Sequence, residues 1–108
     1  MKGFEDLTLC DWHGDRVEVH VRADLKDGEL TLSGQDLGPY VEEIWGDSDY
    51  EYWYHLDKEN TEKLLEAIGG IDDPKAALLR EFRGEGGCRA LQEFCNENGI
   101  KYGFSSYV

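Results

Sequence analysis

Alternation of apolar and polar residues dominates the first third of the chain. Between residues 16 and 24, three valines alternate with charged side chains and a histidine. A period of two is typical of a half-buried antiparallel strand with its apolar side chains on one face. A weaker alternation over residues 5–11 and a clear one over 29–33 flank this segment, with glycine-containing turns between them. We therefore expect three strands joined as hairpins.

Residues 50–56 predict a fourth strand with aromatic side chains on both faces. Three tyrosines share one face, and Trp53 lies on the other. We therefore expect this strand to be covered on both sides or to form part of an interface. The preceding stretch, 34–49, is interrupted by glycines and a proline. Within it, residues 40–45 fit either one helical turn or a short strand.

Helical spacing of apolar residues replaces alternation in the second half of the chain. Asp57 and Asp73 stand where helix N-caps are expected. The spacing predicts three helices and a closing strand, at residues 57–68, 74–83, 87–98 and 100–108. The expected fold class is α+β: a mostly antiparallel sheet of about five strands, with three short helices packed on one face, in the order ββββαααβ. One domain over residues 1–108 accounts for the whole chain.

The charge balance limits the kinds of partner. The 108 residues include 24 acidic side chains and 11 Lys or Arg, a formal net charge of −13. Such a chain repels phosphates, so we expect no direct nucleic-acid partner and no membrane partner. Residues 36–73 hold twelve acidic side chains against two lysines, a balance of −10. This excess favours a basic protein partner.

Residues 40–54 combine this acidity with six of the thirteen aromatic residues. Tyrosine and tryptophan are enriched at protein interfaces and at their energetic hot spots. We therefore expect a small acidic binding protein that docks a basic partner, as toxin-neutralising immunity proteins and nucleic-acid mimics do. The expected contact residues are Tyr40, Glu42, Glu43, Trp45, Asp47, Asp49, Glu51 and Trp53.

Two other classes of function fit the same aromatic segment. A small-ligand or enzymatic domain would use Trp45 or Trp53 as a pocket wall, together with polar groups such as His55, Arg16 or Arg22. An oligomeric adaptor subunit would pack the aromatics against a second copy. Because copies at −13 repel each other, that contact would favour the nearly neutral C-terminal third, residues 74–108.

The residue types that carry catalysis or hold metals occur in weak patterns. Cys10 and His13 have a C-x-x-H spacing but no second pair, and Asp47 begins a calcium-loop pattern that fails at its glycine and glutamate positions. The glycine-rich segment 84–87 lacks the lysine of a phosphate loop. We expect no catalytic residue, metal or cofactor. The three cysteines and the lack of a signal-peptide pattern predict reduced thiols and a cytoplasmic location.

Overall fold

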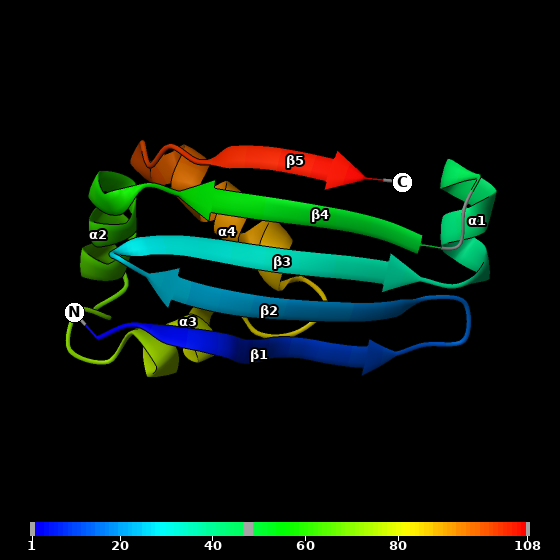
Figure 1. Cartoon of the computed structure of the whole chain (residues 1–108), viewed down its shortest axis with the longest axis horizontal. Coiled ribbons are helices and arrows are strands. Elements are labelled where there is room, and N and C mark those ends of the chain that lie inside the picture. Colours follow the sequence, from blue (N-terminus) through cyan, green and yellow to red (C-terminus); the bar gives the residue numbers. More distant parts are fainter. Residues whose placement is uncertain (1, 47–48, 108) are drawn as a thin grey trace.

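The computed structural model describes residues 2–46 and 49–107. Its strands form one antiparallel sheet in which each strand pairs with the next along the chain, in the order β1-β2-β3-β4-β5 (Figure 1). The strands are β1 (Phe4–His13), β2 (Glu18–Lys26), β3 (Glu29–Leu37), β4 (Asp49–Leu56) and β5 (Gly103–Tyr107). The expected α+β class with a five-stranded antiparallel sheet is confirmed.

Within residues 2–46 and 49–107, four helices accompany the sheet: α1 (Pro39–Trp45), α2 (Lys58–Ala67), α3 (Pro74–Phe82) and α4 (Gly87–Asn98). The predicted order ββββαααβ is therefore wrong, because the chain runs β1-β2-β3-α1-β4-α2-α3-α4-β5. The extra helix, α1, is only seven residues long. Gly38, at φ 120°, turns the chain into it, and Gly46, at φ 81°, ends it. These glycines read as interruptions in the sequence but serve as the two ends of a helix.

The predicted starts of the next two helices are confirmed at their caps. The Asp57 carboxylate accepts a hydrogen bond from the backbone N–H of Asn60 at 2.9 Å. The Asp73 carboxylate accepts one from the N–H of Ala76 at 3.2 Å. Each carboxylate satisfies an N–H that has no partner within its helix.

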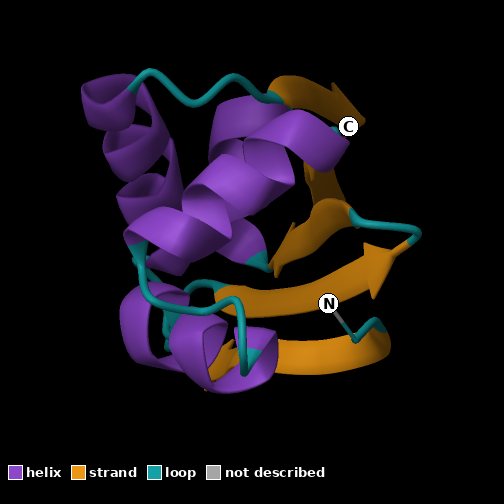
Figure 2. Ribbon diagram, turned by 90° about the vertical axis from the view of Figure 1, so that its left-hand side faces the viewer, coloured by secondary structure: helices purple, strands orange, loops and turns teal. Residues whose placement is uncertain are grey.

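Helices α2, α3 and α4 lie on one side of the sheet. They are behind the strands in Figure 1, and Figure 2 shows helices on one side of the strands and none on the other. The core forms between these layers. Its fully buried leucines come from the strands and from the three helices: Leu9, Leu30, Leu32, Leu56, Leu64, Leu65, Leu78 and Leu91. Helix α1 stands at the end of the sheet, against β3 and β4. No helix of the described residues is long and apolar enough to cross a membrane.

A buried threonine attaches α2 to the sheet. The Thr61 hydroxyl accepts a hydrogen bond from the N–H of Leu30 at 3.0 Å and donates one to the carbonyl of Leu56 at 3.1 Å. Thr61 is 0% exposed. One side chain therefore fixes the ends of β3 and β4 against the first turn of α2.

Candidate binding face of the sheet

The side of the sheet opposite α2, α3 and α4 carries the polar half of each strand's alternation. Along β2, residues 19, 21, 23 and 25 are buried, and the residues between them are partly exposed. The same alternation continues through most of β3 and β4. We call this surface the open face: Asp11, His13, Glu18, His20, Arg22, Asp24, Lys26, Glu29, Thr31, Ser33, Gln35, Leu37, Asp49, Glu51, Trp53 and His55.

A shallow depression of about 510 Å³ lies on the open face across β2, β3 and β4. The strand register places Arg22, Ser33 and Trp53 in one row across these strands. Two strand spacings, roughly 9.6 Å, separate the outer members of the row. Trp53 and Arg22 line the depression on either side of the short Ser33 side chain. His20 and Glu51 line the depression in the next row.

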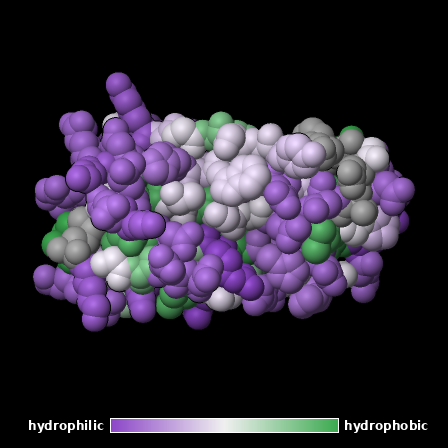
Figure 3. Space-filling view, viewed as in Figure 1, coloured by the Kyte–Doolittle hydropathy of each residue, from purple (hydrophilic) through white to green (hydrophobic). Residues whose placement is uncertain are grey.

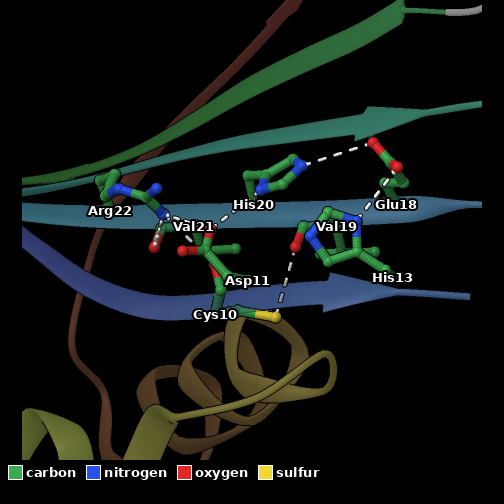
Figure 4. A network of polar contacts seen from close by, with 8 residues as sticks. All are labelled: Cys10, Asp11, His13, Glu18, Val19, His20, Val21 and Arg22. Atoms are coloured by element: carbon green, nitrogen blue, oxygen red, sulfur yellow. Dashed lines mark hydrogen bonds and ion pairs between the residues drawn. The ribbon is translucent and has the colours of Figure 1, made fainter.

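Arg22 is held in place from the side of β1. Its Nη1 lies 2.9 Å from Oδ1 of Asp11 and donates to the backbone carbonyls of Cys10 and Val21, each at 3.3 Å (Figure 4). The Asp11 carboxylate thus neutralises the arginine at the edge of the depression. This arrangement fixes the guanidinium and limits its repulsion of a cationic ligand.

Two histidines extend this network along β1 and β2. His20 Nδ1 lies 2.9 Å from Asp11 Oδ1, and its Nε2 lies 3.7 Å from a Glu18 oxygen. His13 Nδ1 lies 3.1 Å from the other Glu18 oxygen, as Figure 4 shows. Hydrogen bonds from His20 and Arg22 lower the pKa of Asp11, and a hydrogen bond from His13 lowers that of Glu18.

A second depression of about 460 Å³ lies on the other half of the open face. Its lining includes four carboxylates, one lysine, a threonine and a histidine: Glu5, Asp24, Lys26, Asp27, Glu29, Thr31 and His55. His55 accounts for two contacts there, with Glu29 Oε1 at 2.9 Å and with Thr31 Oγ1 at 2.9 Å. The excess of carboxylates makes this depression suited to an ammonium or guanidinium group.

The open face as a whole is hydrophilic and acidic. It carries six carboxylates, on Asp11, Glu18, Asp24, Glu29, Asp49 and Glu51, against the cations of Arg22 and Lys26. Figure 3 shows hydrophilic residues over most of this face, with residues of intermediate hydropathy gathered near its middle. The face therefore combines negative charge with a limited amphipathic centre.

The eight residues expected from the sequence fall in two places. Tyr40, Glu42 and Glu43 lie exposed on α1, where Glu43 pairs with Arg16. Trp45 ends the same helix, while Asp47 lies outside the described residues.

The other three predicted residues belong to β4 and the open face. Asp49 Oδ1 accepts a hydrogen bond from Gln35 Nε2 at 3.1 Å. Glu51 and Trp53 are half-buried and line the larger depression. The structure thus brings Asp49, Glu51 and Trp53 together with residues of β2 and β3. Of these, the sequence analysis names Arg22, as a polar group of a ligand pocket, but none of the others.

The missed residues are Asp11, Glu18, His20, Asp24, Glu29 and Gln35. The alternation in β2 separates its polar side chains from its apolar ones. Only the pairing of β2 with β3 and of β3 with β4 shows that the polar side chains lie on the same face as Trp53. The acidity of residues 36–73 does not form one patch. Asp36 is partly buried on the helix side of β3, while Glu59, Glu62 and Glu66 lie exposed on α2.

The cysteines lie on the helix side. Cys10 and Cys95 are buried and Cys88 is half-buried, all as free thiols. Burial raises the pKa of Cys88 to about 12 and that of Cys95 to about 11, which keeps both protonated at neutral pH. Cys10 is buried while His13 reaches Glu18 on the open face, so they point to opposite sides. Within the described ranges, no group of three or more His, Cys, Asp or Glu side chains is placed to hold a metal ion.

Comparison with known proteins gave no match: no protein-family model fits the chain, and neither curated sequences nor solved structures show significant similarity to it. Any functional conclusion therefore rests on the geometry and charge of the open face.

Proposed function

We propose that this protein is a small binding protein whose acidic open face docks a basic protein partner. The observation that carries the proposal is the excess of carboxylates on a sheet face that α2, α3 and α4 leave uncovered. Clustered carboxylates accelerate encounter with a cationic surface, and the effect weakens with salt. The same charge disfavours nucleic acids and anionic lipids.

Trp53 supplies the short-range part of the interaction. Its indole is half-buried beside Glu51 and lines the larger depression. An arginine from the partner would stack on the indole and pair with the Glu51 carboxylate. The depression around Glu29 and Asp24 would receive a second basic side chain. Tyr40 and Glu42 on α1 extend the contact beyond the end of the sheet.

A protein of this kind acts by covering its partner's cationic surface. If that surface normally binds phosphates, the complex blocks it, which is how an immunity-like inhibitor or a nucleic-acid mimic works. The charge pattern supports this form of the proposal. The carboxylates of the open face would take the place of the natural ligand's phosphates on the partner's cationic surface.

Matched charge reversals test the proposal. The partner is first captured from a lysate of the source cells at about 50 mM salt and released at about 300 mM, where the Debye length falls from roughly 14 to 6 Å. Association rates are then measured for Glu29→Lys/Glu51→Lys and for the control Glu62→Lys/Glu66→Lys on α2. Each pair changes the net charge by +4. We expect the open-face pair to slow association at least tenfold at low salt, and the control pair to have a much smaller effect.

Trp53→Ala separates docking from general attraction. It should speed dissociation of the captured partner while leaving retention by poly-lysine, a non-specific cation, unchanged. Equal slowing by both charge-reversal pairs, or unchanged dissociation of the Trp53 variant, would show that the open face is not the docking surface.

A second candidate function is the binding of a small anionic ligand. The depression of about 510 Å³ has the size of a ligand site, and Arg22, His20, Ser33 and Gln35 line it beside Trp53. A flat carboxylate would stack on Trp53 and pair with Arg22. Fluorescence quenching by aromatic carboxylates, lost in Arg22→Gln, would favour this function over protein docking.

A further inference from the structure

The two outer edges of the sheet differ sharply. β1 forms one edge and β5 the other, as Figure 1 shows. An outer strand carries unpaired backbone N–H and C=O groups along its free side, which readily pair with another strand. Proteins usually block such edges with bulges, charges, proline or a covering loop.

The β1 edge carries several of these protections. Its pairing with β2 is interrupted between Phe4 and Leu7 and again between Thr8 and Cys10. Asp6, at φ 52°, lies in the first irregularity. The N–H of Gly84 donates a hydrogen bond to the carbonyl of Leu9 at 2.9 Å. This edge is therefore bent, charged and partly covered.

The β5 edge carries none of them within residues 103–107. Its sequence, GFSSY, contains no charged residue and no proline, and its register with β4 is continuous from Gly103 to Tyr107. All five residues are exposed. Phe104 and Tyr107 are 51% and 70% exposed, which is unusual for large apolar side chains. No described element lies beyond this strand in Figure 1.

Charge identifies a second copy of the chain as the occupant. A basic partner has no carboxylate to contact on β5 itself. Because GFSSY has no charged side chain, two copies that pair through β5 bring no charge of one strand opposite a like charge of the other.

The β5 sequence is also self-complementary in an antiparallel arrangement. With a twofold axis at Ser105, Gly103 of each copy faces Tyr107 of the other. The sheet already contains this kind of pair, because Gly34 faces Tyr52 across β3 and β4 with the tyrosine ring lying over the glycine. An aromatic side chain covering a cross-strand glycine stabilises strand pairing.

We propose that two copies of this protein associate by antiparallel pairing of their β5 strands, which joins two five-stranded sheets into one of ten strands. The contact is isologous, as a twofold dimer requires. Five residues bury less than the roughly 1,200 Å² at the lower end of standard interfaces, so the dimer forms at high protein concentration, on the order of 0.1–1 mM. It leaves the open face free and does not depend on the docking function.

Sedimentation equilibrium of the purified chain, without any partner, tests the dimer. We expect the average mass to rise toward twice the monomer mass between about 10 µM and 1 mM. Ser105→Lys and Ser105→Glu each place like charges opposite one another and should abolish the rise. An equimolar mixture of the two variants should restore it, because a mixed dimer places the introduced lysine of one copy opposite the introduced glutamate of the other. This rescue excludes misfolding as the cause of the loss.

Thr8→Lys is the matched control, because it adds the same charge to an exposed residue of the opposite edge. It should leave the mass curve as it is in the wild type. A wild-type chain that stays monomeric at about 1 mM, or one whose association survives both Ser105 variants, would overturn the proposal.

Discussion

The Tyr52 hydroxyl donates a 2.9 Å hydrogen bond to Oδ1 of Asp36, diagonally across the β3–β4 ladder on the helix side of the sheet. Burial raises the pKa of both groups, although the hydrogen bond from Tyr52 partly offsets the effect at Asp36. The pair thus places a desolvated carboxylate close to the core. It is satisfied by hydrogen bonding, but it still costs free energy when ionised.

Asp36→Asn should therefore stabilise the protein at pH 7. A carboxyl whose pKa is raised in the folded state destabilises that state once pH exceeds both its unfolded and folded values. The asparagine oxygen keeps the acceptor for Tyr52 and removes the charge. We expect the gain, measured by urea unfolding, to shrink as pH falls toward about 4, where the unfolded carboxyl takes up its proton. A variant less stable than the wild type at pH 7 would contradict this account.

Gly34→Ala should be destabilising by about 1–3 kcal/mol, because its methyl group has no space. A Cβ at Gly34 would lie 2.0 Å from Cε2 of Tyr52 and would push the ring off the strand. Gly103→Ala is the control, since its nearest neighbouring atom is the His55 carbonyl oxygen at 3.9 Å. The control should change the unfolding free energy by no more than about 0.5 kcal/mol in dilute solution. Similar losses in both variants would mean that ring packing is not the cause.

The sequence predicts the strands and the three longer helices because each has a clear period and a recognisable end. Asp57 and Asp73 fix two helix starts through local hydrogen bonds, which depend on a few neighbouring residues. Helix α1 is different, because seven residues between Gly38 and Gly46 are too short to show a helical period. Its helical state depends on contacts with β3 and β4, which no local pattern records.

The candidate site is less predictable from sequence than the fold. Composition identifies Glu51 and Trp53, and the ligand-pocket alternative names Arg22, but nothing in the sequence joins Glu51 with His20, some thirty residues earlier. The antiparallel register creates that relation by placing Arg22, Ser33 and Trp53 in one row. The net charge of residues 36–73 is misleading for another reason: it groups Asp36 with residues that lie on other surfaces.

Thr61→Val should lower the unfolding free energy by about 1–3 kcal/mol. Valine keeps the shape of threonine but leaves the buried N–H of Leu30 and the carbonyl of Leu56 without their bridging hydroxyl. Thr31→Val removes a hydroxyl from the open face, where water can replace the contact with His55. The control should cost less than about 0.5 kcal/mol in chemical denaturation. Equal losses of unfolding free energy in Thr61→Val and Thr31→Val would show that the buried hydrogen bonds of Thr61 contribute no more than an exposed contact.

His20→Ala should raise the pKa of Asp11 toward its ordinary value. The hydrogen bond from His20 is the largest cause of the lowered value, and Arg22 is the next. A lowered folded-state pKa contributes stability above the unfolded value, and that contribution disappears as pH falls through the folded value. The Asp11 titration, followed by the carboxyl carbon NMR shift, should therefore move to higher pH in the variant. His55→Ala removes a histidine that contacts Glu29 instead and should leave the Asp11 titration in place. If the Asp11 titration has the same midpoint in His20→Ala as in the wild type, Arg22 alone accounts for the lowered pKa of Asp11. In that case, His20→Ala would also leave the loss of stability at acidic pH unchanged.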